Sequence, residues 1–528
     1  MTNPAFKIAL IGECWGEEEE REQKPFVGKA GQQLDKLLGA AGIARSECFI
    51  TNVIHERPPK NDFGIYYTDK GRNKPTEALT QAHERLKKEL KESGVSVVVP
   101  LGNEPLFALT GKRGIESWRG SILEGEGYKI IPTFHPSAVL RMGGPSVWYL
   151  PAAVKDLKRS LNETTTGLAT PPNVRLILNS EELRMWLEGA RGTTVALDIE
   201  VLYKYRGEEV ASIAFSNTFN EAVVVPFVRE VSEETLEEGK KKPTLVWTSV
   251  NTMPWEEMTA CHALIKDFFA SDAWPKVGQN LTFDINTLRR VGMIDHVEGV
   301  VMDTLVAHSY VHPEFPHALG FLATWYTRIP FFKDQIEEIN EAFWRYNGLD
   351  ACATLEVAAG LDKELKRMAD GGAFYYNYLH KLLPTLWEMN HTGIRIDKDY
   401  QKDLKANLQK ELAEEFDGIA GLSEGIIENH RSSVQCAKYF YEHKGYVPYT
   451  KKVKKEGEYV SRVTTDEIAL KKIARKHQDP VASKLLVLRE KQKQLSANAN
   501  MKTDANGIVR TTYLFAKTGR FRSGADQE

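Results

Sequence analysis

The stretch Val195-Ala196-Leu197-Asp198-Ile199-Glu200 decides how the middle of this 528-residue chain folds. It is an apolar run that ends in two acids two residues apart, which predicts a buried β-strand. Side chains on a strand alternate between its two faces, so Asp198 and Glu200 point the same way. The strand therefore presents two hard oxygen ligands together.

Two later segments, NLTFD and YNGLD, carry further acids and are predicted to be helical. In them Asn280 lies four positions before Asp284, and Tyr346 lies four positions before Asp350. Residues at that spacing share one face of a helix. We expect these side chains to converge with the acids of the strand.

Converging acids of this kind typically hold two divalent cations about 4 Å apart, one activating water and the other stabilising the leaving oxygen of a phosphodiester. Mg²⁺ or Mn²⁺ suits an all-oxygen ligand set, whereas zinc prefers Cys or His, which these motifs lack. A single Asp-x-Glu at a strand end is usually a solvated edge or a cap. The hypothesis therefore depends on the order of the three motifs along the chain.

That order, DIE after a strand, NxxFD some eighty residues later and YxxxD some sixty residues further on, resembles the 3′–5′ proofreading exonuclease domain of family-A DNA polymerases. The resemblance implies a DnaQ-like, RNase-H-like α/β fold. It assigns one metal ion to Asp198, Glu200 and Asp350. Asp198 would also contact a second ion, on which Asp284 acts through water, and Tyr346 would orient the attacking water. Every member of the set is present, so the resemblance predicts an active exonuclease.

Composition places the chain among globular proteins, with 42% hydrophobic and 27% charged residues and a net charge of −3. Its length predicts three or four domains. No stretch is long enough to span a membrane, and the start of the chain lacks a signal-peptide pattern. Five scattered cysteines without a CxxC pair predict a reducing, cytoplasmic location, which is the host cytoplasm if the source is viral.

The first 160 residues are predicted to alternate strands with helices, which indicates a parallel α/β sheet. The predicted strands are Lys7–Ile11, Cys48–Ile54, Ser96–Leu101 and Lys129–Phe134, and the predicted helical runs include Gln32–Leu38 and Leu79–Lys91. Ligands of such sheets bind at the carboxyl ends of the strands. Motif-like segments follow all four strands, namely GECWG, TNV, LGN and HPS.

Together with KPFVGKAG and RPP, these segments resemble the uracil-DNA glycosylase superfamily, closest to the family-4 type, and imply a three-layer α/β/α domain. By this resemblance Glu13 lies in the water-activating loop and Phe26 stacks on a flipped uracil. Asn52 would read the edge of the uracil, and His135 would stabilise the negative charge on its O2. An enzyme that acts on a base takes it out of the stack into such a pocket.

Two departures from the family-4 pattern bear on activity. The four cysteines of its iron–sulfur cluster are not matched, and Glu56 stands where one would precede the RPP motif, so no cluster is expected. Cys14 and Trp15 replace a small residue and a proline beside Glu13. We expect Trp15 to fill the water site or the mouth of the pocket, which predicts uracil recognition with weak or no excision.

The chain from Asn377 onward is predicted to be helical, and its HTGIRID turn resembles the start of the thumb of family-A polymerases. Lys and Arg outnumber Asp and Glu about two to one after Arg431, which is typical of a segment that follows a phosphate backbone. A later segment, KTGRFRS, resembles the one that contacts primer–template just before the palm. This resemblance assigns DNA contacts to Arg510, Lys517, Thr518 and Arg520, and the glycosylase resemblance assigns them to Ser137 and Arg141, where the HPS loop meets the DNA backbone.

The predicted domains are a glycosylase-like domain at 1–162, a linker at 163–172, the exonuclease at 173–370 and a mostly helical thumb region at 371–528 that stops before the palm. This fusion resembles bacteriophage replication polymerases. We expect a DNA replication or repair protein that acts on single-stranded 3′ ends and primer–template. We expect no polymerase activity from the chain alone, and a second polypeptide could carry the palm and fingers. Two alternatives stay open: a non-catalytic DNA-binding or uracil-sensing subunit of a split polymerase, and a protein whose main activity is uracil excision.

Overall fold

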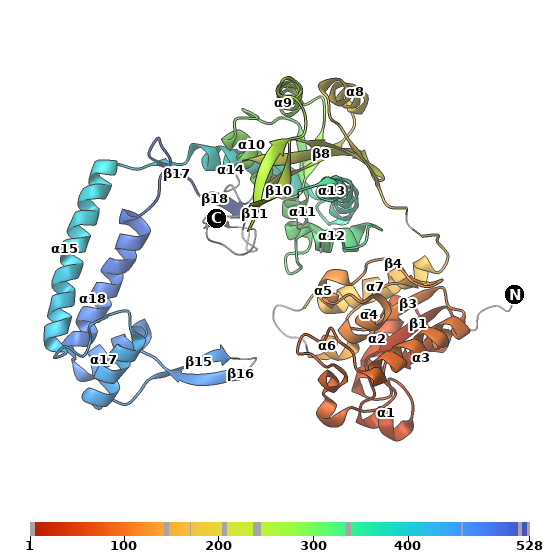
Figure 1. Ribbon diagram of the computed structural model, residues 1–528, viewed down its shortest axis with the longest axis horizontal. Helices are drawn as coiled ribbons and strands as arrows, with labels where there is room; N and C mark the ends of the chain where they lie inside the picture. The colour runs from red at the N-terminus through yellow and green to blue at the C-terminus, as the bar shows by residue number, and fades with distance from the viewer. Residues whose placement is uncertain are drawn as a thin grey trace. The chain divides into compact units, whose positions relative to one another are not determined.

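The computed structural model describes residues 6–141, 147–168, 170–202, 209–235, 244–333, 339–455, 458–515 and 520–524. The chain folds into two compact units (Figure 1). One comprises Met1–His391 with Tyr513–Glu528, and the other comprises Thr392–Thr512. None of the helices in the described ranges is both long enough and apolar enough to cross a membrane.

The N-terminal sheet has five strands in the order β2-β1-β3-β5-β4. The strands are β1 (Ile8–Gly12), β2 (Cys48–Asn52), β3 (Val97–Pro100), β4 (Leu123–Glu124) and β5 (Lys129–Ile130). All neighbours are parallel except β4, which runs antiparallel to β5 along one edge. The predicted parallel sheet is confirmed, and the antiparallel edge strand is an addition that the sequence did not predict.

Both faces of this sheet are buried, which makes the domain a three-layer structure. The helices are α1 (Glu17–Glu22), α2 (Lys29–Ala41), α3 (Glu77–Ser93), α4 (Asn103–Thr110), α5 (Ile115–Trp118), α6 (Pro136–Leu140) and α7 (Tyr149–Glu163). On β1, Ile8 and Leu10 belong to one hydrophobic cluster, whereas Ala9 and Ile11 belong to another. Because neighbouring residues of a strand face opposite sides, each face of the sheet has its own apolar core.

The second sheet has six strands in the order β13-β12-β7-β8-β9-β6. They are β6 (Asn173–Leu176), β7 (Val195–Val201), β8 (Val210–Thr218), β9 (Glu221–Pro226), β12 (Lys276–Gly278) and β13 (Val300–Asp303). The strands β7, β8 and β9 are antiparallel, and the other neighbours are parallel. A separate antiparallel pair, β10 (Val228–Thr235) and β11 (Thr244–Asn251), follows β9.

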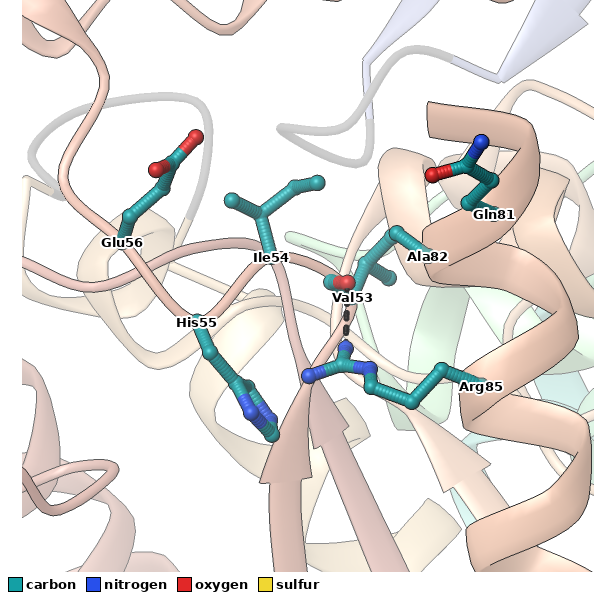
Figure 2. Close-up of a pocket in the computed structure, with 7 residues that line it drawn as sticks. All are labelled: Val53, Ile54, His55, Glu56, Gln81, Ala82 and Arg85. Atoms are coloured by element: carbon teal, nitrogen blue, oxygen red, sulfur yellow. Dashed lines mark hydrogen bonds between the residues drawn. The ribbon is translucent and has the colours of Figure 1, made fainter. Parts of the chain in front are cut away.

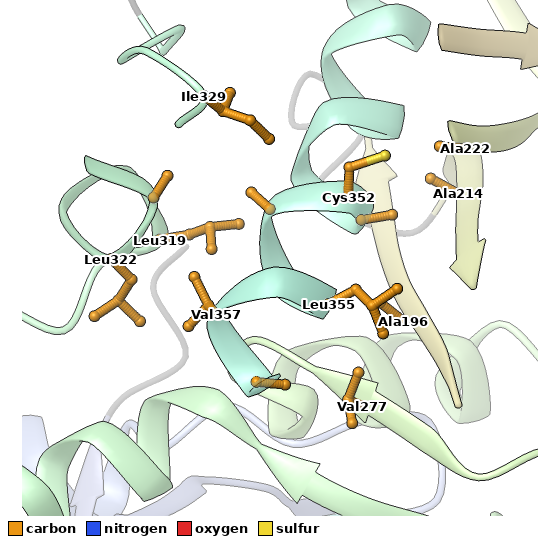
Figure 3. Close-up of a cluster of buried hydrophobic side chains, with 14 of the residues drawn as sticks. Ala196, Ala214, Ala222, Val277, Leu319, Leu322, Ile329, Cys352, Leu355 and Val357 are labelled. Atoms are coloured by element: carbon orange, nitrogen blue, oxygen red, sulfur yellow. The ribbon is translucent and has the colours of Figure 1, made fainter. Parts of the chain in front are cut away.

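A long helix, α13 (Glu341–Arg367), packs against this sheet. Other helices in this part are α8 (Ser180–Ala190), α9 (Trp255–Phe269), α10 (Leu281–Arg290), α11 (Thr304–Val311) and α12 (Leu319–Tyr326). Figure 3 shows Cys352 and Leu355 of α13 facing the sheet and Val357 facing α12. Gly348 permits the close approach, since a Cβ there would lie 2.5 Å from a methyl group of Val174. The residues next to Gly348 are thereby held at the sheet.

The unit Thr392–Thr512 is built on two long helices that pack together, α15 (Lys398–Leu422) and α18 (Pro480–Gln494). Salt bridges join them, as between Lys484 and Glu415 at 2.8 Å. The rest of the unit consists of α16 (Ser433–Ala437), α17 (Glu467–His477), β14 (Ile394–Arg395), β15 (Thr450–Lys455), β16 (Glu458–Val463), β17 (Ile508–Val509) and two π-helical turns, Lys438–His443 and Leu495–Ala499. Helices dominate as predicted, but the β15–β16 hairpin was not predicted.

Within the first unit, ion pairs join the end of α7 to Lys129 on β5 and to Arg328, which lies beyond the predicted linker. Glu163, the last residue of α7, accepts hydrogen bonds from Arg328 Nε at 3.0 Å and from Lys129 Nζ at 2.8 Å. Its side chain is 7% exposed. Burial alone would raise the pKa of Glu163, but the hydrogen bonds from Arg328 and Lys129 lower that pKa to about 2.

The depressed pKa of Glu163 makes stability depend on pH. The unfolded chain binds a proton at Glu163 more readily than the folded one, so this carboxylate contributes up to about 3 kcal/mol above pH ~4.5, and the contribution is lost as pH falls towards about 2. We expect Glu163→Gln to lower the thermal unfolding midpoint at neutral pH, and by progressively less at acid pH. Glu188→Gln, on an exposed position of α8, is the control. If the difference in unfolding midpoint between Glu163→Gln and the parent stayed constant with pH, the lowered pKa of Glu163 would be contradicted.

Candidate active site

Three carboxylates converge where β7 meets α13. The ligand oxygens of Asp198, Glu200 and Asp350 all lie within 4.8 Å of one another. Along β7 the residues before Asp198 are buried, and Ile199 between the two acids is buried as well, while both acids are partly exposed. The predicted shared face of Asp198 and Glu200 is therefore present, and the packing of α13 adds Asp350 to it.

Asp284 lies next to this cluster. It is 4% exposed, and its carboxylate accepts a hydrogen bond from the backbone N–H of Ile199 at 3.1 Å. Asn280 is not on the same helix face, which corrects the sequence prediction. The helix α10 begins at Leu281, and Asn280 is its N-cap with φ 60°. Asparagine adopts the left-handed region more readily than most residues, and its N–H is bound at 3.2 Å by the carboxylate of Asp303.

Tyr346 also reaches the cluster, and two neighbours that the sequence did not single out accompany it. Asn347 Nδ2 donates to Asp198 Oδ2 at 2.7 Å, so it orients that carboxylate. Lys333 Nζ lies 2.7 Å from the Tyr346 hydroxyl and 3.1 Å from a carboxylate oxygen of Asp350. Asn347 follows the tyrosine of the YxxxD motif, which was a usable signal. Lys333 lies before that motif in the sequence, and no local pattern predicted its role.

Burial raises the pKa of every acid in the cluster, and repulsion from neighbouring carboxylates adds to it at Asp198, Glu200 and Asp284. For Asp198, burial is the largest cause of the raised pKa, followed by the negative charges of Asp350, Glu200 and Asp284. The pKa values of Glu200 and Asp284 rise to about 8, again mainly because of burial. Lys333 has the opposite effect on Asp350. Burial raises the pKa of Asp350, and the nearby ammonium group of Lys333 lowers it.

This donor set fits a divalent metal. Its ligands are all carboxylate oxygens, which hard cations such as Mg²⁺ and Mn²⁺ prefer. Buried like charges repel one another, and a bound cation would relieve that repulsion. Asp198, Glu200 and Asp350 could hold one ion directly, and Asp284 is near enough to Asp198 to raise its pKa.

A second group of functional side chains lies at the carboxyl ends of β1 and β2. The ring of Phe26 lies against Gly12, where a Cβ would come within 2.6 Å of it. Phe26 has φ 55°, an uncommon conformation for an aromatic residue. Asn52 is 2% exposed and donates from Nδ2 to the Cys14 carbonyl at 2.8 Å, while its Oδ1 is buried without a hydrogen-bond partner among the described residues. An unpaired buried amide oxygen is costly unless a ligand satisfies it.

His135 is the third member of this group, with its ring centroid 5.8 Å from that of Phe26. Its Nδ1 lies 2.8 Å from Ser137 Oγ, and Arg141 donates to the same hydroxyl at 3.3 Å. Burial, followed by the charge of Arg141, lowers the pKa of His135 to about 4, so the imidazole is neutral at pH 7. Burial raises the pKa of Glu13 to about 7, with a smaller contribution from Glu104.

Trp15 stacks on His55, with ring centroids 5.7 Å apart and 14° between the ring planes. The stacking fixes the plane of the indole beside Cys14, whose pKa is raised to about 12 by burial and by the charge of Glu13. Obstruction of the pocket by Trp15 stays a prediction.

An open pocket of about 300 Å³ lies between the segment that follows β2 and helix α3 (Figure 2). Arg85 of α3 donates to the backbone carbonyls of Asn52 at 2.8 Å and Val53 at 2.6 Å, so it supports the strand end that carries Asn52. Glu56 also lines the pocket and accepts a hydrogen bond from Tyr66 at 2.6 Å.

The residues of this domain do not fit an iron–sulfur cluster. Its only cysteines are Cys14 and Cys48, and both are free thiols. Two thiols cannot supply the four cysteine ligands that such clusters need.

The remaining predicted DNA contacts fall in different parts of the chain. Arg510 belongs to the unit Thr392–Thr512 and pairs with Asp504. Arg520 belongs to the other unit and is exposed. Lys517 and Thr518 lie outside the described residues. A role in DNA binding stays a prediction for all of them.

Comparisons with known proteins match the two sites separately. Residues 1–158 match the uracil DNA glycosylase superfamily, and residues 174–366 match a 3′–5′ exonuclease family. The type-4 uracil-DNA glycosylase of Thermotoga maritima is 37% identical over 138 residues, which cover 26% of this chain and 67% of that protein.

Longer but weaker similarity extends to polymerases. The DNA polymerase of Bacillus phage SP01 is 20% identical over 456 residues, which cover 80% of this chain and 46% of that protein. The chain thus matches slightly less than half of the phage polymerase. A solved structure, the POL domain of Pol1 from M. smegmatis, is 20% identical with a TM-score of 0.47, covering 66% of this chain and 54% of that one. The chain belongs to the uracil-DNA glycosylase superfamily through its N-terminal residues and continues into a 3′–5′ exonuclease domain of the family-A DNA polymerase type.

Proposed function

We propose that this protein removes nucleotides from the 3′ ends of DNA by two-metal hydrolysis, with Mg²⁺ or Mn²⁺ at the carboxylate cluster. The observation that carries the proposal is the convergence of Asp198, Glu200 and Asp350 within 4.8 Å. Asp284 and Tyr346 stand beside them, as the resemblance of the three motifs leads us to expect. Single-stranded 3′ ends and frayed primer–template are the substrates that this activity implies.

Each side chain has a part in this chemistry. Two divalent cations bound here would activate the attacking water and stabilise the leaving oxygen. Asn347 fixes the carboxylate of Asp198, and the hydroxyl of Ser212 donates to Asn347 at 2.9 Å from the neighbouring strand. The N–H of Ile199 holds Asp284. The hydroxyl of Tyr346 is placed to orient water at the cluster.

A labelled-strand assay tests this proposal. A 5′-labelled single strand, with and without uracil, is incubated with the purified chain in Mg²⁺ and in EDTA. The proposal predicts a ladder that shortens from the 3′ end in Mg²⁺ and is absent in EDTA. Full-length strands in both conditions would contradict it. Alkali-sensitive breaks at uracil that persist in EDTA would instead indicate that base excision is the main activity.

We further propose that the glycosylase-like domain recognises uracil. The buried, unpartnered Oδ1 of Asn52 favours this function, because the N3–H of uracil could satisfy it. The ring of Phe26 offers a stacking surface, and the neutral imidazole of His135 can donate to a developing anion without carrying a charge of its own. Excision is expected to be weak or absent because Trp15 stands beside Glu13.

The uracil proposal predicts that Asn52→Asp erases the preference for uracil-containing strands. A carboxylate can still accept from the uracil N3–H, but it cannot replace the second Nδ2 hydrogen as a donor to the adjacent uracil carbonyl, and it repels that carbonyl. Binding to uracil-containing strands should therefore weaken by about tenfold, to the affinity for thymine-containing strands. Two quantities are measured, the affinity ratio for matched uracil and thymine oligonucleotides and the free uracil released over time. The exonuclease activity of the same variant reports whether it is folded. Equal binding of both strands by the parent would refute recognition, and rapid uracil release would refute the obstructed pocket.

Other expectations from the sequence stay predictions. These are the lack of primer extension by the 528 residues alone, a second polypeptide with the palm and fingers, a cytoplasmic location and the bounds of the four predicted segments.

A further inference from the structure

We propose that Lys333 is a positioning residue of the exonuclease centre, which acts by holding the hydroxyl of Tyr346 against the carboxylate of Asp350. This inference rests on the proposed exonuclease function and adds a residue outside its three motifs.

The geometry around Lys333 is that of a shared donor. Its Nζ lies 2.7 Å from the Tyr346 hydroxyl and 3.1 Å from Asp350. The same nitrogen lies 4.9 Å from the centroid of the Tyr346 ring. The side chain is only 30% exposed, although the residue lies on a connecting segment rather than on a helix or strand. An ammonium group offers three N–H donors, so it can bind both partners at once.

The two residues that precede Lys333 are held by contacts with both domains. The ring of Phe332 packs edge-on against Tyr346, with centroids 5.5 Å apart. The backbone N–H of Phe331 donates to Ser121 Oγ at 3.0 Å, and the ring of Phe331 packs edge-on against Trp118 at 5.2 Å. Ser121 and Trp118 belong to the glycosylase-like domain, which therefore helps to place a side chain of the exonuclease centre.

This placement has a chemical consequence for Tyr346. Because the phenol oxygen accepts a hydrogen bond from Lys333, its own O–H can donate to the carboxylate of Asp350 or, when substrate binds, to a water or a phosphate oxygen. Asp350 is oriented by the same cation. A hydroxyl that is held in place beside the metal ligands contributes more to the rate of hydrolysis than a mobile one, because small displacements at a reacting centre reduce the rate steeply.

The competing explanation is that Lys333 only neutralises the carboxylates and is displaced when metal binds. The two explanations predict different kinetics. A displaced counterion would compete with Mg²⁺, so its removal would lower the half-saturating Mg²⁺ concentration and leave kcat unchanged. A positioning residue would lower kcat when removed, and its effect would depend on Tyr346.

The test compares Lys333→Met, Lys333→Arg, Tyr346→Phe and the Lys333→Met/Tyr346→Phe double variant in the full chain. We expect Lys333→Met to lower kcat by about 10- to 100-fold with little change in KM, as for loss of a hydrogen bond to a charged group. Lys333→Arg should recover part of that loss. In the Tyr346→Phe background, Lys333→Met should lower kcat by about threefold or less, because the effects of substitutions at coupled residues do not add. Lys366→Met, on an exposed position of α13, is the matched control and should leave kcat unchanged.

Three results would overturn the inference: parental kcat in Lys333→Met, a lower Mg²⁺ requirement with unchanged kcat, or equal effects of Lys333→Met with and without Tyr346→Phe. Thermal unfolding midpoints confirm that the variants are folded. If the parent itself releases no nucleotides, the exonuclease proposal fails along with this inference. If the parent is active and Lys333→Met has the same kcat, the exonuclease proposal stands and only the inference about Lys333 fails.

Discussion

Replacing both Asp198 and Glu200 by Ala is expected to abolish the release of nucleotides from DNA, with a loss of roughly 1,000-fold or more because ligands to both metal ions disappear. The two acids come from one strand and meet Asp350 within 4.8 Å. Asp350 and Asp284 remain in the variant, but two carboxylates from different helices cannot hold both ions. Nucleotide release from a 5′-labelled single strand in Mg²⁺ measures the effect.

Two further measurements separate this effect from misfolding. The thermal unfolding midpoint of Asp198→Ala/Glu200→Ala should equal or exceed that of the parent, because buried acids that repel one another destabilise the fold. Binding to single-stranded DNA should largely survive. Glu181→Ala/Glu188→Ala, at exposed positions of α8, is the matched control. Degradation of DNA at the parental rate by Asp198→Ala/Glu200→Ala would show that the metal assignment is wrong.

Arg119→Met is expected to destabilise the first unit by about 3–5 kcal/mol, since it leaves a buried charge without its partner. Arg119 and Asp156 have side-chain exposures of 0% and 1%. Arg119 Nε donates to Asp156 Oδ2 at 2.9 Å, and Nη1 lies 3.4 Å from the hydroxyl of Thr324 on α12. In the variant, Asp156 would keep only the hydrogen bond from Thr133 at 2.8 Å among these contacts. Thermal and urea unfolding measure the loss.

The charge itself can be tested by removing both partners. Arg119→Met/Asp156→Leu should recover much of the stability, because no charge then remains buried. Arg184→Met, which breaks an exposed pair with Glu181 at 3.4 Å, should cost less than about 1 kcal/mol. A loss for Arg119→Met as small as that for Arg184→Met would contradict the prediction, and so would a double variant less stable than Arg119→Met.

Several features of both sites were predictable because they follow from short-range patterns. The alternation along β7 placed Asp198 and Glu200 on one face, and the four-residue spacing placed Tyr346 with Asp350 on α13. The polar segments after β1 and β2 predicted a site at those strand ends, where Phe26 and Asn52 are found. The same logic failed at Asn280, because a helix can begin one residue later when a capping residue takes a left-handed conformation.

The sequence by itself determined the order and type of the four parallel strands of the N-terminal sheet and the acids that face a common side, since these depend on periodicity within a few residues. Only the tertiary structure decided that Lys333 reaches Tyr346, that Asn347 orients Asp198 and that Arg119 is buried against Asp156. Each of these contacts joins residues on different segments, and no local pattern encodes them. Such contacts form because the packing of helices on the two sheets buries polar groups, and each buried charge or donor must then find a partner.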